Sequence, residues 1–213
     1  KVLRLNIDGT IDKAFGEAGV TTITRPDGFA FPGDGVADPQ GGLILTVGGS
    51  ELVRLRPDGT PDPTFATDGA YELPVFFDNC ASGALGPAPG PTAVLYLATQ
   101  VPGDCSDPML ATTLVALDVG GNPVPAFAGQ PSATFPAGQE ITDLAVDPSR
   151  RVVLISEDRL VRLLPSGQVD LTFGTAGVAL KPAALNPWTH LAVGTSGVYL
   201  LGSRTSDGTR HAA

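Results

Sequence analysis

The sequence feature that most constrains the fold is a segment that occurs four times. Its copies span residues 2–19, 52–69, 114–129 and 160–177, and the second reads LVRLRPDGTPDPTFATDG. A leucine, a glycine and a phenylalanine keep the same register in every copy: Leu5, Leu55, Leu117 and Leu163; Gly9, Gly59, Gly121 and Gly167; Phe15, Phe65, Phe127 and Phe173. The phenylalanines are 50, 62 and 46 residues apart, and self-similarity in this range is typical of propellers, solenoids and repeat arrays.

Each copy begins as a strand and continues into a tight turn. The motif Leu-Val-Arg-Leu alternates with period two, which is typical of a half-buried strand. Asp8-Gly9 and Asp58-Gly59 follow it in two copies, and such pairs make tight turns because glycine takes positive φ at little steric cost. Further short apolar runs lie between turn residues, and no segment has a 3.6-residue apolar period. We therefore expect almost no helix.

The repeat predicts an all-β chain built as a β-propeller. Four antiparallel strands in a unit of about 50 residues describe a propeller blade, and radial stacking buries both faces of each small sheet, with the recurrent phenylalanine as the wedge between blades. We expect one repeat domain over residues 1–213 with about four blades, namely 20–58, 70–120, 133–166, and 178–205 completed by 1–9. The N-terminal strand at 2–7 then closes the last blade beside 198–201, which removes two exposed edges. A β-sandwich is the alternative, but it does not explain the fourfold register.

The motif Leu-x-Arg-Leu-x-x-Asp-Gly-x-x-Asp-x-x-Phe-Gly-x-x-Gly resembles the delta-sixty repeat of bacterial β-propeller proteins. The first and fourth copies match it best, through Arg4, Gly9, Asp12, Phe15, Gly16 and Gly19, and through Arg162, Gly167, Asp170, Phe173, Gly174 and Gly177. The second copy has Ala66 after its phenylalanine, and the third has Ala116, Val124 and Ala128 in place of Arg, Asp and Gly. The resemblance covers nearly the whole chain and implies the propeller fold. For function it implies only that such repeats occur in large secreted or surface proteins without assigned chemistry.

Composition narrows the classes of partner. A hydrophobic content of 42% supports a globular protein. The formal net charge of −9 argues against nucleic acid or an anionic membrane as a partner. The longest apolar runs, such as 93–98, are far shorter than the ~18 residues that span a bilayer. No signal peptide is visible, yet the chain opens inside a repeat, so we expect a processed or trimmed start.

The residue types that carry catalysis are scarce. The only histidines are His190 and His211, and neither lies in a recognisable motif. Cys80 and Cys105 lack the spacing of zinc ligands, and no Gly-rich phosphate loop precedes a helix. We therefore expect no catalytic residues, no metal site and no cofactor.

The aspartates of the repeat have two interpretations. Asp8 with Asp12, and Asp58 with Asp62, resemble pieces of calcium loops, but calcium takes six to eight oxygens and no closing glutamate follows. The interpretation that we favour is structural: Asp8 and Asp58 shape the turn, while the second aspartate of each copy bonds nearby backbone amides.

One arginine and one aspartate of the repeat are either both present or both absent in a given copy. Arg4 accompanies Asp12, Arg54 accompanies Asp62 and Arg162 accompanies Asp170, each eight residues apart, whereas the third copy has lost both. Removing one member of a partly buried pair costs more than removing both. We therefore predict three structural ion pairs; independent use of the two residues is the alternative.

The cysteines and the enlarged loops complete the candidate list. Cys80 opens one predicted strand and Cys105 follows the end of its neighbour, so we predict a disulfide and an oxidising compartment; two buried thiols are the alternative. Loops carry recognition in repeat proteins, and two enlarged loops hold the aromatic residues Phe29, Phe31, Phe76 and Phe77. These could contact a protein or glycan partner, but packing within the loops is the interpretation that we favour.

These observations predict a non-enzymatic propeller that acts as an extracellular or cell-surface interaction scaffold, with self-association possible. One alternative is a structural subunit of a surface fibre or array. Another is a hydrolase or lyase that uses carboxylates in a central funnel, which carboxylate pairs of raised pKa would favour.

Overall fold

The computed structural model describes residues 1–24, 32–38, 40–47, 51–72, 83–87, 95–100, 111–130, 132–136, 141–156, 159–180, 188–206 and 209–212. These residues form strands and turns and no helix. They belong to two compact units. The first comprises Lys1–Leu73 and Val119–Asn122, and the second comprises Pro74–Asp118 and Pro123–Ala213.

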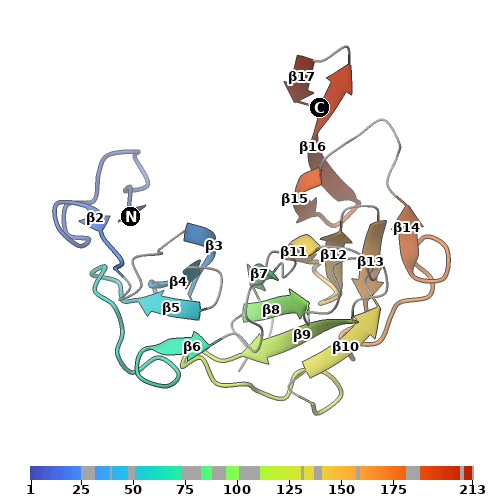
Figure 1. The fold of residues 1–213 in the computed structure, drawn as a ribbon, viewed down its shortest axis with the longest axis horizontal. Helices are drawn as coiled ribbons and strands as arrows, with labels where there is room; N and C mark the ends of the chain where they lie inside the picture. The colour runs from blue at the N-terminus through green and yellow to red at the C-terminus, as the bar shows by residue number, and fades with distance from the viewer. Residues whose placement is uncertain are drawn as a thin grey trace. The chain divides into compact units, whose positions relative to one another are not determined.

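The first unit contains a two-stranded sheet and a four-stranded sheet (Figure 1). Its strands are β1 (Val2–Leu3), β2 (Val20–Thr21), β3 (Pro32–Ala37), β4 (Leu43–Val47), β5 (Glu51–Leu55) and β6 (Ala70–Glu72). β1 pairs with β2, and the larger sheet has the order β3-β4-β5-β6, all antiparallel. The Leu-Val-Arg-Leu segment is therefore the third strand of the complete sheet.

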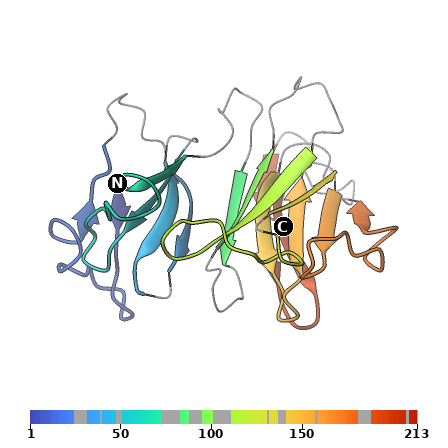
Figure 2. The same cartoon turned by 90° about the horizontal axis from the view of Figure 1, so that it is seen from below.

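The second unit contains two four-stranded sheets and one three-stranded sheet (Figure 2). Its strands are β7 (Gly83–Pro87), β8 (Leu95–Gln100), β9 (Ala111–Leu117), β10 (Ser132–Pro136), β11 (Ile141–Val146), β12 (Val152–Ser156), β13 (Arg159–Leu163), β14 (Val178–Leu180), β15 (Trp188–Val193), β16 (Val198–Ser206) and β17 (Thr209–Ala212). The sheets have the orders β7-β8-β9-β10, β11-β12-β13-β14 and β15-β16-β17. The first strand of the middle sheet, β11, packs against both β7 and β15, so the leading strands of the three sheets lie next to one another.

These sheets confirm an all-β chain of repeated four-stranded antiparallel units, consistent with a β-propeller. Among the described strands, β1 pairs only with β2, and β16 pairs with β15 and β17. The sheets are not closed through these pairings, so the blade number and the closing contact of 2–7 with 198–201 stay predictions. The sequence predicts the last strand at 198–201, whereas β16 continues to Ser206 and pairs with β17.

Apolar side chains of the repeat form the core between the sheets. In the second unit, Leu114 of β9, Phe127, Leu144 of β11 and Leu154 of β12 belong to one buried cluster. Phe127 comes from the third copy of the repeat and belongs to the same buried cluster as side chains of the following sheet. This position is consistent with the wedge role predicted for the recurrent phenylalanine. Its equivalents Phe15 and Phe65 are also buried.

A tight turn connects successive copies of the repeat in the first unit. The Gly16 amide donates to the Asp58 carbonyl at 2.7 Å, and the buried Thr21 hydroxyl donates to the Gly59 carbonyl at 2.7 Å. Gly59 has a φ of +85°, and a Cβ atom there would lie 3.0 Å from the Phe15 ring. Only glycine combines this left-handed backbone with so close an approach. The Asp-Gly turn of one copy is therefore the surface on which the preceding phenylalanine packs.

Candidate functional site

The structure brings together all three predicted Arg–Asp pairs. Arg4 Nε donates to Asp12 Oδ2 at 2.8 Å, and the other two pairs repeat this contact. Arg54 Nη1 lies 3.0 Å from Asp62 Oδ2, and Arg162 Nε lies 2.9 Å from Asp170 Oδ2. Two of these guanidinium groups also stack on the phenylalanine of their copy: Arg4 on Phe15 at 4.7 Å and Arg162 on Phe173 at 4.6 Å from the ring centroid. The pairs hold the turn next to the wedge residue.

The second copy extends its pair into a buried network. Arg54 Nε donates to Asp38 Oδ2 at 3.0 Å, and Arg54 Nη2 donates to Gln40 Oε1 at 2.8 Å. Arg56 Nη2 lies 3.0 Å from Asp62 Oδ1. The Asp38 and Asp62 side chains are 0% and 5% exposed, so two buried carboxylates face two guanidinium groups. Sequence reasoning missed Asp38, because this residue lies outside the repeated segment.

The fourth copy contains a related network, in which a different segment of the chain supplies the second arginine. Asp147 follows β11 as Asp38 follows β3, and Arg151 Nε donates to Asp147 Oδ2 at 2.6 Å. Arg151 Nη1 also lies 3.9 Å from Asp170 Oδ2. Here the second arginine comes from the turn between the inner strands, not from the Leu-Val-Arg-Leu strand. Both networks contain two arginines and two aspartates.

Hydrogen bonds confirm the structural interpretation of the repeat aspartates. Asp8 Oδ1 accepts from the Thr10 amide at 3.0 Å and from its hydroxyl at 2.6 Å, and Asp58 accepts equivalently from Thr60. Asp62 accepts from the hydroxyl and amide of Thr64, and the Thr64 hydroxyl is the largest cause that lowers the Asp62 pKa. The pKa values of Asp8, Asp12, Asp58 and Asp170 are lowered by similar bonds, led by Thr10, Arg4, Thr60 and Thr172 respectively.

His190 lies beside the carboxylate of Asp143. His190 lies within β15 and is exposed. Its Nδ1 lies 3.7 Å from Asp143 Oδ2. The same Asp143 oxygen accepts the Leu191 amide at 2.7 Å, so this carboxylate joins β11 to β15. Within the described residues, no group of three His, Cys, Asp or Glu side chains is placed to hold a metal ion.

Several predicted residues lie outside the described part of the chain. They are Phe29, Phe31, Phe76, Phe77, Cys80 and Cys105. His211 lies in β17, where only the backbone is described. The disulfide and the aromatic binding loops therefore stay predictions.

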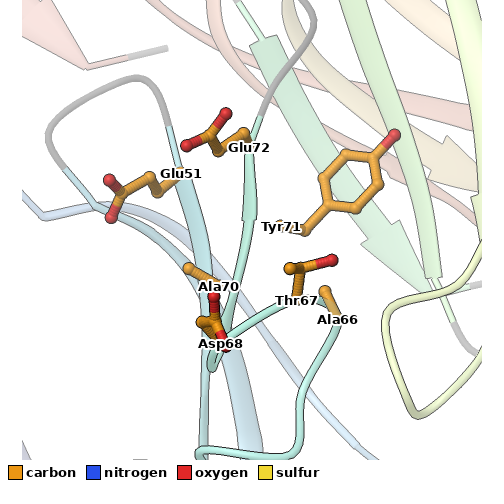
Figure 3. A pocket seen from close by; sticks show the side chains of 7 residues that line it. All are labelled: Glu51, Ala66, Thr67, Asp68, Ala70, Tyr71 and Glu72. Carbon is orange, nitrogen blue, oxygen red and sulfur yellow. The ribbon is translucent and has the colours of Figure 1, made fainter.

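A cavity beside the edge strand β6 is the best candidate for a ligand site (Figure 3). Its volume is about 490 Å³, which suits a small ligand or a short segment of a partner. It is lined by Glu51, Ala66, Thr67, Asp68, Ala70, Tyr71 and Glu72. Sequence reasoning missed these residues because the Leu-Val-Arg-Leu strand and its partner carry no binding motif.

The register of β5 and β6 explains the chemistry of this cavity. Glu51 lies directly opposite Glu72, and Leu52 lies opposite Tyr71. Figure 3 shows the carboxylates of Glu51 and Glu72 on one side of β6 and the Tyr71 ring directed away from them, on the side of Thr67. Like charges directly opposite one another are unfavourable in a sheet. Partial burial raises the pKa of Tyr71, which keeps its hydroxyl protonated as a hydrogen-bond donor.

A second, smaller cavity lies in the second unit. Its volume is about 200 Å³, and Asp147, Arg151, Arg162 and the turn 194–197 line it. Both arginines bind the aspartates described above. The charges of this cavity therefore already take part in the repeat network.

Comparisons with known proteins bear on the fold. The family model described as "Domain of unknown function (DUF5122) beta-propeller" matches residues 41–65, which include β4, β5 and the turn after them. No curated protein matches the chain. The crystal structure of a protein of unknown function from Bacteroides caccae has a TM-score of 0.52 and 10% identity, over 86% of this chain and 59% of that chain. The extracellular domain of a putative hybrid two component system from B. thetaiotaomicron has a TM-score of 0.38 and 10% identity, over 90% and 28% of the two chains.

The short family match and the repeated four-stranded sheets together support a β-propeller fold. The chain spans 59% of the length of the B. caccae protein. The finer resemblance to the delta-sixty repeat stays a prediction. In the part of the chain that the structure describes, no helix has the length and apolar character needed to cross a membrane.

Proposed function

We propose that this chain is a non-enzymatic β-propeller module that binds a protein partner through the cavity beside β6. The observation that carries the proposal is the pair Glu51 and Glu72, which face each other at the edge of a sheet, next to a partly buried Tyr71. The described residues that line this cavity include Glu51, Asp68 and Glu72 and no arginine or lysine. The acidic lining favours a basic peptide segment, and an edge strand can add such a segment through its backbone.

The lowered pKa values of the repeat aspartates favour a binding role over catalysis. An acid–base enzyme needs a carboxyl whose pKa is raised toward neutrality. The described aspartates whose pKa departs from its ordinary value all shift downward, because hydroxyls, amides and arginines stabilise the charged form. This pattern suits fixed structural charges. An extracellular or cell-surface location is part of the same proposal and rests on the resemblance alone.

A titration with a lysine-rich peptide tests the proposed site. The wild-type chain is expected to bind such a peptide with saturation, and weaker binding is expected as salt rises, because exposed charges are screened. The double variant Glu51→Gln/Glu72→Gln should bind at least about fivefold more weakly, since it removes two charges from the cavity. Glu17→Gln is the matched control, because Glu17 is an exposed glutamate of the first copy outside the cavity. Equal losses in both variants would show a bulk charge effect and would contradict the proposed site.

A further inference from the structure

The two arginine networks are built on the same type of turn, which allows them to be compared position by position. In the turns 38–42 and 147–151, the amide of the first residue donates to the carbonyl of the fifth, and the amide of the fourth donates to the carbonyl of the first. All four distances lie between 2.8 and 3.1 Å. Gln40 of the first turn therefore corresponds to Ser149 of the second.

This difference leaves the strand arginine of the fourth copy with fewer partners than its equivalent. Every side-chain nitrogen of Arg54 donates a hydrogen bond, and Nη2 donates to Gln40 Oε1 at 2.8 Å. Arg162 donates through Nε to Asp170, and its Nη2 reaches Thr172 Oγ1 only at 3.4 Å. Among the described residues, Arg162 Nη1 has no hydrogen-bond partner.

The second arginine of this network adds further N–H groups. Arg151 stands where the other turn has Gly42. Its Nε donates to Asp147 at 2.6 Å, but its Nη1 lies 3.9 Å from Asp170 Oδ2, which is beyond hydrogen-bond distance. The Asp147 and Asp170 side chains are both 5% exposed, whereas those of Arg151 and Arg162 are 33% and 16% exposed. The guanidinium groups are thus the accessible part of the network.

Both arginines line the smaller cavity of the second unit, whose volume is about 200 Å³. Thr195 and Ser196 of the turn between β15 and β16 also line it, and their amides and hydroxyls make no hydrogen bond within the described residues. Asp147 contributes to the lining, but both of its oxygens already accept from Arg151. The apolar wall consists of Val153, Val193 and Val198. All of these residues belong to the second unit.

The cavity is therefore rich in hydrogen-bond donors and selects a ligand that brings acceptor oxygens. A carboxylate fits best, because its two oxygens can accept parallel hydrogen bonds from a guanidinium group. Phosphate and sulfate also bring oxygens, but they carry more negative charge close to two buried aspartates, and like charges repel. The volume is below the range typical of drug-sized ligands, so the cavity suits a small acid or a single side chain.

We propose that the cavity formed by Arg151, Arg162 and the turn 194–197 binds a carboxylate group, from a small organic acid or from a side chain of a partner polypeptide. The carboxylate takes the role that Gln40 Oε1 has in the second copy, as the acceptor that completes the hydrogen bonds of the strand arginine. This site is separate from the cavity beside β6 and takes a ligand of opposite charge.

Sodium acetate is the probe, titrated into the ¹⁵N-labelled full chain against sodium chloride at equal concentration. A ligand of so few atoms binds weakly, and NMR chemical shifts detect weak binding. Saturable shifts are expected at the amides of Thr195 and Ser196 and at the Nε–H of Arg162. Acetamide has nearly the same shape without the charge and should bind about tenfold more weakly, because a charge-assisted hydrogen bond is the stronger one.

Two variants at one exposed position form a matched pair. Ser149→Gln copies the turn of the second copy and supplies an amide oxygen to Arg162 from within the chain, so acetate binding should fall at least about tenfold. Ser149→Ala leaves the cavity as it is and should bind acetate like the wild type. Neither change removes a member of the charged network, so both variants should fold.

A blocked glutamate, N-acetyl-glutamate-N-methylamide, separates the two sources of the carboxylate. Binding at least as tight as that of acetate identifies the side chain of a polypeptide. Weaker binding than that of acetate identifies a free acid, because the cavity then excludes the attached backbone. Both results support a carboxylate site.

The proposal is overturned by any of three results: no saturable shift at residues 194–197 in a chain that is folded by circular dichroism, equal binding of acetate and acetamide, or equal acetate binding by Ser149→Gln and Ser149→Ala. None of these results bears on the lysine-peptide titration, because the cavity beside β6 belongs to the first unit.

Discussion

At the scale of single residues, the second copy of the repeat has an alanine, Ala66, at a backbone position that favours glycine. Gly16 and Gly174 follow their phenylalanines with φ values of +56° and +55°, and Ala66 occupies the same position at +48°. The Ala66 amide donates to the Gly120 carbonyl at 2.6 Å, as the Gly16 amide does to Asp58. The hydrogen bond that links successive copies therefore holds Ala66 in the left-handed region, which costs an alanine roughly 1–2 kcal/mol.

The variant Ala66→Gly is expected to stabilise the chain. Relief of the left-handed alanine outweighs the extra flexibility that glycine gives the unfolded chain, for a net gain of about 0.5–1 kcal/mol. The midpoint of urea unfolding measures it. The reverse change Gly16→Ala should destabilise, because a Cβ atom there would lie 2.4 Å from the Val20 carbonyl oxygen. A lower midpoint for Ala66→Gly would show that its methyl group contributes packing that exceeds the backbone strain.

At the scale of one sheet and its turn, the Asp38–Arg54–Asp62 network makes a prediction about coupled substitutions. Arg54→Ala leaves the buried Asp38 without its Arg54 partner and Asp62 with the Arg56 ion pair alone, and should cost about 3–5 kcal/mol. The triple variant Asp38→Ala/Arg54→Ala/Asp62→Val copies the third repeat, which has Ala116 and Val124 at the last two positions. It should recover a large part of that loss, because no uncompensated charge remains buried.

Urea unfolding of the single variants and the triple variant gives the coupling directly. Arg4→Ala is the control, since this arginine is more exposed and binds one aspartate only; its cost should be much smaller. Additive costs across the triple variant would contradict the network and would mean that each residue acts alone.

The same elements show what the sequence could and could not predict. The Arg–Asp pairs were predictable because both partners lie within one copy and disappear together in the third. Asp38 was not, because its partner Arg54 lies across two strands and only the pairing of β4 with β5 brings them together. The cavity beside β6 was missed because Glu51 and Glu72 become neighbours only through the sheet register.

At the scale of the whole molecule, the repeat explains the architecture better than it explains the activity. One segment used four times supplies the third strand, the turn and the wedge of successive sheets, so a single pattern predicts most of the fold. Function depends on where the copies differ. The residues of the second copy that line the cavity beside β6 lie at such a place. A repeat motif predicts what its copies share, and structure is needed to find what one copy alone presents.

The lowered pKa values of the repeat aspartates predict how the whole chain responds to acid. A carboxyl whose pKa is lower in the folded chain than in the unfolded chain contributes stability at every pH above its unfolded value, here the ordinary value of 3.8. That contribution is lost as the pH falls through 3.8 toward the folded pKa. Because five described aspartates shift in this direction, the free energy of unfolding should be nearly flat above about pH 5 and should fall steeply below pH 4.

At Asp62 and Asp170 the largest cause of the lowered pKa is a threonine hydroxyl, which provides a specific test. The Thr64 hydroxyl leads at Asp62 and the Thr172 hydroxyl leads at Asp170. The double variant Thr64→Val/Thr172→Val raises both folded pKa values toward 3.8, so the chain should be less stable at pH 7 and should lose less of its remaining stability between pH 5 and pH 3. Thr22→Val is the control, because Thr22 is exposed and contacts neither aspartate in the hydrogen bonds described above. Urea unfolding at each pH measures the slope. If the double variant lost stability by the same amount at pH 7 and at pH 3, the two hydroxyls would stabilise the fold without acting through the charge of the aspartates, and the acid response would have another origin.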